Sequence, residues 1–114
     1  ASCADRRLET VLDSVAASKR PIWVWGAGSG GRRLIEQNRR LSGLAIGFID
    51  SDLCKIGGEV MGLPVTAPES LLVPEIRQRD PFVVIASTYE KEIAARLDPF
   101  GFVRTRDYHV ASLS

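Results

Sequence analysis

The stretch Ile22-Trp23-Val24-Trp25-Gly26-Ala27-Gly28-Ser29-Gly30-Gly31 joins an apolar run to a glycine-rich segment, and a helix-like segment, residues 32–40, follows directly. A strand, a glycine turn and a helix in this order form a phosphate cradle. Gly26 permits the tight turn, Gly28 lets the backbone approach a pyrophosphate, and Gly31 lets the helix pack close to the strand. The free N–H groups and the positive dipole end of the helix then face the anion.

A carboxylate stands where the dinucleotide-binding pattern requires one. Asp50 follows a second apolar run, residues 45–49, and lies about 20 residues beyond the glycines, where a carboxylate binds ribose hydroxyls. Its negative charge disfavours a 2′-phosphate, so unmodified nucleotides such as NAD or a UDP-sugar are expected rather than NADP. The alternative is that Asp50 forms a turn with Ser51 and Asp52, because Asp and Ser readily bond the backbone that follows them.

The remaining segments alternate between strand-like and helix-like patterns. An amphipathic helix over residues 5–17 precedes the first strand, and Phe82–Ala86 is a third buried strand candidate. Further expected elements are a helix over about 30–41 ended by Gly43, a short strand near 59–61 among loops and turns, helical pieces at 69–72 and 75–79, a helix over 90–97, and a candidate edge strand in the tail, 102–110. The predicted domains are the N-terminal helix, residues 1–20, and a nucleotide-binding domain, residues 21–114.

These elements predict an α/β fold: one Rossmann-like domain with a short parallel sheet in the order 3-2-1-4, a candidate fifth strand, flanking helices and an extra N-terminal helix. In such sheets the ligand crevice lies outside the carboxyl ends of the strands. Three segments would meet there, and their residues form the predicted binding set: Gly26, Ala27, Gly28, Ser29, Gly30, Gly31, Arg32, Asp50, Ser51, Ala86, Ser87 and Thr88. Arg33, like Arg32, is a candidate phosphate contact, and Trp25 could line the pocket. The alternative for Ser87 or Thr88 is that one of them caps the next helix.

Composition excludes several classes of protein. The 114 residues carry 25% charged side chains and a net charge of +1, which argues against a nucleic-acid-binding surface. No apolar run reaches the length of a membrane span and no signal peptide is evident, so we expect a cytoplasmic location. Cys3 and Cys54 are expected to be free thiols, and with His109 they do not form a metal-ligand spacing, so no metal is expected.

Four segments together resemble a known group: Trp25–Gly31, Gly47–Asp52, Gly57–Val65 and Val84–Ser87. They are similar to the small Rossmann-like domains of bacterial polysaccharide-biosynthesis proteins. That group includes the N-terminal domains of nucleotide-sugar 4,6-dehydratases and epimerases and of sialic-acid-type sugar acyltransferases, and domains fused to glycosyltransferases and methyltransferases. The resemblance implies a nucleotide or nucleotide-sugar ligand, with Gly26, Gly28 and Gly31 at the phosphates and Asp50 near the ribose or base.

The sequence lacks the catalytic pair of short-chain sugar dehydrogenases and epimerases. Those enzymes need Tyr-x-x-x-Lys, whereas Ile93 stands four residues after Tyr89 and Ser112 four residues after Tyr108. We therefore assign no catalytic residue and expect a binding domain within a larger sugar-modifying epimerase, dehydratase, glycosyltransferase or acyltransferase. The alternatives are a ligand-free interaction or dimerisation module and an NAD-sensing regulatory domain; methyl transfer is disfavoured because Val24 stands where S-adenosylmethionine sites place a carboxylate.

Overall fold

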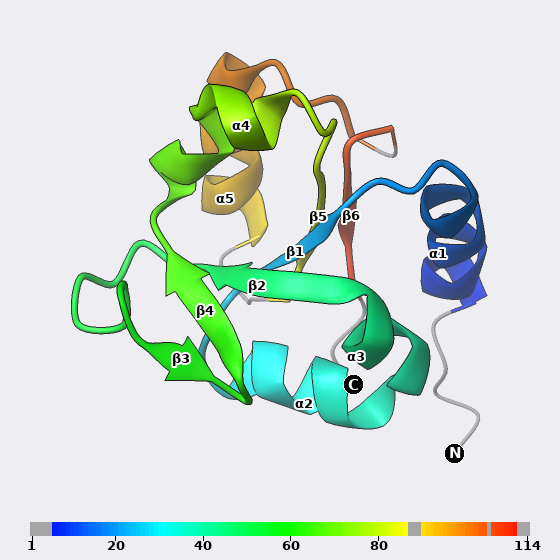
Figure 1. The fold of residues 1–114 in the computed structure, drawn as a ribbon, viewed down its shortest axis with the longest axis horizontal. Helices are drawn as coiled ribbons and strands as arrows, with labels where there is room; N and C mark the ends of the chain where they lie inside the picture. The colour runs from blue at the N-terminus through cyan, green and yellow to red at the C-terminus, as the bar shows by residue number, and fades with distance from the viewer. Residues whose placement is uncertain (1–5, 87–89, 105, 112–114) are drawn as a thin grey trace.

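The computed structural model describes residues 6–86, 90–104 and 106–111, and within them one sheet of six strands forms the centre of the molecule. The strands are β1 (Ile22–Trp25), β2 (Ala45–Ile49), β3 (Glu59–Val60), β4 (Leu63–Thr66), β5 (Phe82–Ile85) and β6 (Tyr108–Val110), in the spatial order β3-β4-β2-β1-β5-β6 (Figure 1). Every neighbouring pair is parallel except β3 with β4. The expected α/β class is confirmed: β4-β2-β1-β5 is the 3-2-1-4 order, and β6 is the edge strand expected in the tail.

The two central strands are buried along their whole length. All four residues of β1 and all four of β5 are buried, as their continuous apolar runs predict for parallel strands that are covered on both sides. Side chains alternate between the faces, so Ile22 and Val24 join one hydrophobic cluster while Trp23 and Trp25 join the other. The sheet therefore separates two cores.

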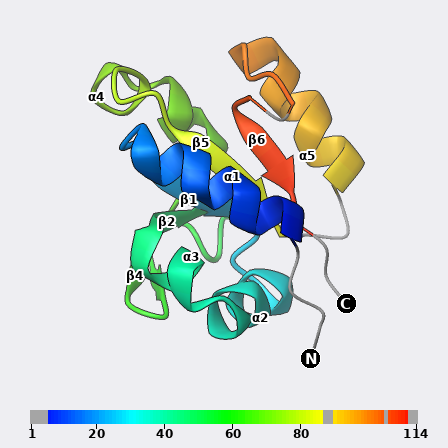
Figure 2. The ribbon, with the colours of Figure 1, turned by 90° about the vertical axis from the view of Figure 1, so that its right-hand side faces the viewer.

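Helices cover both faces of the sheet. On one face lie α1 (Arg6–Ala17), α2 (Ser29–Gln37) and α3 (Arg39–Leu44), whose buried residues share a cluster with Val24 and Val84. On the other lie the 3-10 helix η1 (Pro68–Leu72), α4 (Pro74–Arg77), α5 (Glu90–Leu97) and the 3-10 turn η2 (Asp98–Phe100), which pack around Trp25 and Ile85. Figure 2 shows α1 lying across the sheet on the first face, with α5 on the far side of β6.

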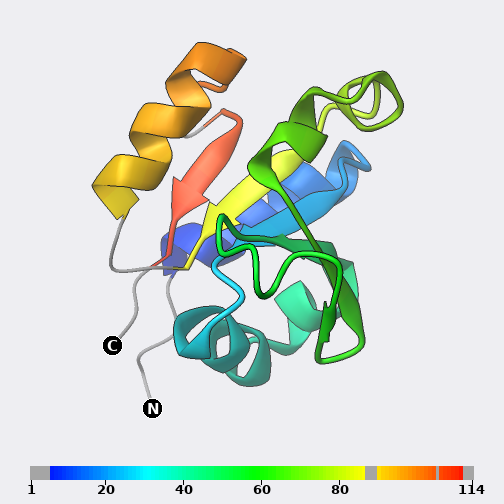
Figure 3. The same cartoon turned by 90° about the vertical axis from the view of Figure 1, so that its left-hand side faces the viewer.

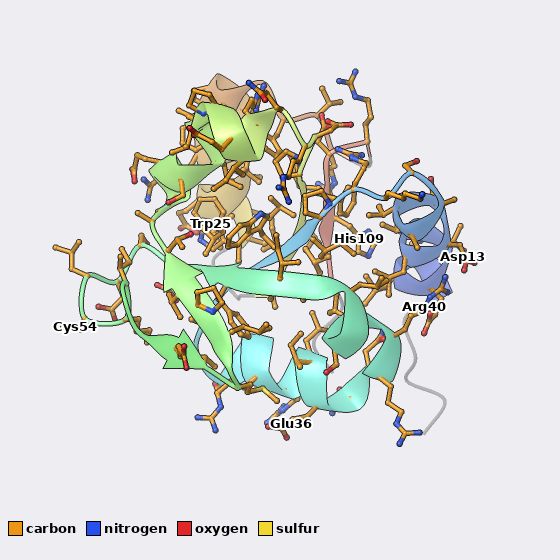
Figure 4. All side chains as sticks on the ribbon, viewed as in Figure 1. Asp13, Trp25, Glu36, Arg40, Cys54 and His109 are labelled. Carbon is orange, nitrogen blue, oxygen red and sulfur yellow. The ribbon has the colours of Figure 1, made fainter. Side chains whose placement is uncertain are left out.

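The N-terminal helix belongs to the core of this fold. Leu8, Leu12 and Val15 are at most 3% exposed and contribute to the same cluster as β1 and β5. Arg40 of α3 also forms ion pairs with Glu9, at 3.6 Å, and with Asp13 of α1 (Figure 4). The expected N-terminal helix therefore packs against the sheet of this fold.

The predicted helix over residues 30–41 is wrong in its extent. The chain leaves helical geometry at Asn38 (φ −128°, ψ 96°), where the side-chain oxygen accepts a hydrogen bond of 2.9 Å from the Leu41 N–H and so begins α3. Gly43 lies inside α3 and does not end a helix. Asn38 therefore ends α2 and caps α3, although the apolar pattern of the sequence continues through it.

The segment around Pro64 was expected to be loop and turn, and it contains β4. The actual turn is the pair Met61 and Gly62, both with positive φ (53° and 80°), which joins β3 to β4 as a tight hairpin. β4 then pairs with β2, with Val65 opposite Phe48, and takes the third position of the parallel sheet. No helix within the described ranges is long and apolar enough to cross a bilayer.

Candidate functional site

A cavity of about 780 Å³ opens at the carboxyl ends of β1, β2 and β5. Its size falls within the range of small-molecule sites, roughly 300–1,000 Å³. The lining residues come from the turn after β1, the loop after β2, the end of β5 and the helix α5: Trp25, Gly28, Ser29, Gly30, Arg33, Asp50, Ser51, Asp52, Lys55, Ala86, Glu92, Ile93 and Arg96. This is the edge of the sheet where open α/β folds bind ligands.

The glycines of the turn divide into two groups. Gly26 has φ 125°, a backbone conformation that favours glycine, and its N–H donates to the Ile49 carbonyl at 2.8 Å, at the end of the β1–β2 pairing. A Cβ on Gly31 would lie 1.7 Å from the Gly26 oxygen, so the start of α2 packs directly on the turn. Gly28 faces the cavity, and the nearest atom to a Cβ built on it is the Lys55 Nζ, at 3.4 Å. Gly26 and Gly31 build the turn, and Gly28 keeps the cavity open.

The amino end of α2 opens into the cavity. Gly28 is the N-cap residue, and no side chain caps the helix. Gly28, Ser29 and Gly30 line the cavity, so the backbone of the first turn and the positive end of the helix dipole lie at its wall. This wall suits an anionic group.

Asp50 holds the glycine turn to the loop after β2. Its Oδ2 accepts a hydrogen bond of 2.9 Å from the Ala27 N–H, and its Oδ1 accepts one of 2.8 Å from the Asp52 N–H. The Asp52 Oδ1 in turn accepts from the Cys54 N–H at 2.9 Å. The expected alternative, a turn with Asp52, is therefore present, and each carboxylate oxygen keeps further acceptor capacity for a ligand.

The structure brings half of the predicted binding set into the cavity wall. Gly28, Ser29, Gly30, Asp50, Ser51 and Ala86 line it. Gly26, the buried Ala27 and Gly31 stand behind this wall, and Arg32 lies on an exposed face outside it. Ser87 and Thr88 lie outside the described residues.

Several lining residues were not in the predicted set. Arg33 and Trp25, the further candidates from the sequence, both line the cavity. The other lining residues outside the set are Asp52, Lys55, Glu92, Ile93 and Arg96. The first turn of a helix that follows a parallel strand must lie at the carboxyl edge, so α5 could have been included on topology alone. Lys55 gave no sequence signal, because its position depends on the path of a loop.

The charges of the cavity wall are unevenly paired. Arg96 lies over the Trp25 ring, 5.8 Å from its centroid, and pairs with Glu69 at 3.3 Å outside the cavity (Trp25 is labelled in Figure 4). Asp50 and Asp52 accept backbone N–H groups. Among the described residues, neither Arg33 nor Lys55 forms an ion pair, so two cations remain available at this wall.

The described residues contain no group of three or more His, Cys, Asp or Glu side chains arranged to hold a metal ion. Cys54 is an exposed free thiol in the loop after β2 (Figure 4), and Cys3 lies outside the described residues. The polar groups that the cavity offers include backbone N–H groups, serine hydroxyls, carboxylates and cations.

Comparison with solved structures identifies a similar fold in UDP-D-quinovosamine 4-dehydrogenase from Vibrio fischeri. The two share 24% sequence identity with a TM-score of 0.56, and the match covers 80% of this chain and 75% of that chain. No protein-family model matches the sequence, and no curated protein matches it. The likeness establishes the Rossmann-like α/β fold.

Proposed function

We propose that the chain binds a nucleotide or nucleotide-sugar, of the NAD or UDP-sugar type, in the cavity at the carboxyl edge of the sheet. The observation that carries the proposal is the joint lining of one cavity by Gly28, Ser29 and Gly30 at the open end of α2 and by Asp50 at the end of β2. The first group suits phosphate and the second suits ribose hydroxyls. The similar Vibrio fischeri structure carries the name of an enzyme acting on a UDP-sugar, which supports a ligand of that class.

The role of the domain in this proposal is binding within a larger protein of polysaccharide or cell-envelope biosynthesis. The sequence has no Tyr-x-x-x-Lys pair, and the cavity lining contributed by the described residues includes neither tyrosine nor histidine. Asp50 places a negative charge where the ribose would lie, and this favours NAD or a UDP-sugar over NADP. The chemistry of the parent protein would come from another domain.

Titrations followed by thermal unfolding test the proposal. Separate samples receive UDP-glucose, UDP-N-acetylglucosamine, NAD, NADP and S-adenosylmethionine; a ligand at 100 times its Kd stabilises the folded state by about 2.7 kcal/mol. We expect a shift with UDP-sugars or NAD and a smaller one with NADP. A shift with NAD alone would favour the NAD-sensing alternative. No shift with any ligand at millimolar concentration would favour an interaction module instead.

A pair of glycine variants locates the site. Gly28→Val places a branched side chain in the cavity, whereas Gly58→Val changes a glycine of the neighbouring loop that does not line it. We expect the first variant to lose ligand affinity at unchanged folding and the second to keep it, measured by calorimetric titration. Equal affinities for Gly28→Val and the unmodified chain would exclude this cavity as the phosphate site.

A further inference from the structure

We propose that Lys55, with Arg33, forms a cationic clamp for the two linked phosphates of a pyrophosphate ligand at the glycine turn. This inference rests on the proposed function and names the group that the site recognises: the pyrophosphate diester that NAD and UDP-sugars share. In the glycine pattern only the backbone contacts the phosphates, whereas here two side chains would contact them as well.

Lys55 reaches the glycine turn from a different part of the chain. It lies in the loop between β2 and β3, and its Nζ lies 3.4 Å from the position a Cβ on Gly28 would take. Figure 3 shows this loop beside the segment that leads from β1 into α2. Gly28 is where the backbone is expected to approach a pyrophosphate. The ammonium group therefore stands beside the expected phosphate position.

The backbone of this loop is fixed at several points. The Lys55 N–H donates to the Asp52 carbonyl at 2.9 Å, and the Gly58 N–H donates to the Lys55 carbonyl at 3.1 Å. Asp50 joins the loop to the glycine turn through its bonds to Asp52 and Ala27. The main chain that carries Lys55 is thus positioned relative to the turn before any ligand binds, which reduces the entropic cost of binding.

Within the described residues, the Lys55 ammonium group forms no ion pair. The carboxylates of Asp50, Asp52 and Glu92 line the same cavity, and none of them forms an ion pair with Lys55. The nearby amino end of α2 carries the positive end of the helix dipole and repels a cation. A second cation, Arg33, lines the same cavity from α2 itself. An anion bound between Lys55, Arg33 and the amino end of α2 would be attracted by all three groups.

The charge of a pyrophosphate diester matches this arrangement. Each of its phosphates carries one negative charge, and the wall offers one cation from the loop and one from α2, together with backbone N–H groups. A nucleoside monophosphate offers one phosphate to these groups, and a nucleoside offers none. Affinity should therefore increase from nucleoside to monophosphate to diphosphate-linked ligand.

The test measures affinities of the unmodified chain, Lys55→Met and the control Lys91→Met, which alters an exposed lysine of α5 that does not line the cavity. The probes are uridine, UMP, UDP-N-acetylglucosamine and NAD, titrated calorimetrically at two salt concentrations. We expect Lys55→Met to weaken the diphosphate-linked ligand about ten-fold or more, as loss of a charge-assisted contact does, and to reduce the salt dependence of binding. Lys55→Arg should recover part of the affinity, and Lys91→Met should behave as the unmodified chain. The arms with NAD and UDP-N-acetylglucosamine separate the two sources of pyrophosphate.

The outcomes separate this inference from the proposed function. If the unmodified chain binds no nucleotide, the proposed function is wrong and the clamp with it. If it binds and Lys55→Met binds as tightly as Lys91→Met, only the clamp is wrong. Urea unfolding of each variant verifies that the folded state is intact, which the exposed position of Lys55 leads us to expect.

Discussion

At the scale of single residues, the closest steric constraint in the glycine turn is at Gly31. A Cβ there would lie 1.7 Å from the Gly26 carbonyl oxygen, which is backbone and cannot rotate away. We predict that Gly31→Ala destabilises the fold by about 3 kcal/mol or more, because α2 must move off the turn. The matched change Gly43→Ala, in α3 with open space around the new methyl group, should stabilise by about 0.5–1 kcal/mol. Urea unfolding of both variants measures the difference, and a similar cost for the two would contradict the packing described for the turn.

The residue scale also shows what sequence could predict of the site. The residues that directly follow β1 and β2, such as Gly28 and Asp50, were identified because parallel strands bring their carboxyl ends together. Which of two neighbouring arginines faces the cavity depends on the rotation of α2, about 100° per residue, and the structure places Arg33 there rather than Arg32. The backbone partners of Asp50 depend on the loop that follows it, and no sequence pattern specifies them.

At the scale of elements, Asn38 separates two helices that the apolar pattern joins. Its side chain accepts the Leu41 N–H at 2.9 Å, while its own N–H donates to the Ile35 carbonyl at 3.4 Å. We predict that Asn38→Ala costs about 1 kcal/mol through loss of the cap, with Asn38→Asp retaining most of the stability. Chemical denaturation of the two variants measures both effects. If Asn38→Ala left the free energy of unfolding unchanged, packing of Leu41 alone would position α3.

Helices and strands with a continuous apolar pattern are predicted well from the sequence, whereas a strand whose segment contains glycine and proline is not. α5 occupies the predicted residues 90–97, and the buried runs of β1 and β5 are strands as expected. β4 was not expected because Gly62 and Pro64 are turn-forming residues, yet only Gly62 belongs to the turn. Pro64 is accommodated because β4 lies near the edge of the sheet, where its pairing with β3 is short.

At the scale of the whole molecule, the cavity and the network of polar contacts around Arg20 and Asp107 lie at opposite ends of the strands. The cavity gathers Lys55 from the loop after β2 and Arg96 from α5, residues far apart in the sequence that the folded sheet brings together. At the amino ends of the strands, Arg20 stands just before β1 and contacts segments that precede β5 and β6. The proposed binding site and the contacts that join the amino ends of the strands thus lie at different ends of one sheet.

Arg20 and Asp107 hold those amino ends together. The Arg20 side chain donates to the carbonyls of Asp80 (2.8 Å) and Arg106 (2.7 Å) and to the Asp107 carboxylate (2.9 Å), and Asp107 also accepts the Val103 N–H at 2.8 Å. The two side chains are only 12% and 8% exposed. We predict that Arg20→Met costs about 3 kcal/mol, because the buried Asp107 carboxylate then loses its buried partner and keeps the longer pair with the exposed Arg106, at 3.5 Å.

Arg40→Met is the control, since Arg40 is 40% exposed and pairs with exposed carboxylates of α1; its loss should cost less than about 1 kcal/mol. Urea unfolding measures both variants, and calorimetric titration of the fraction that remains folded tests the separation of functions. The Arg20→Met protein should keep its nucleotide affinity, because no atom of Arg20 lines the cavity at the opposite ends of the strands. A similar cost for the two arginine variants would show that the amino ends of β1, β5 and β6 are held by their hydrophobic contacts without the ion pair.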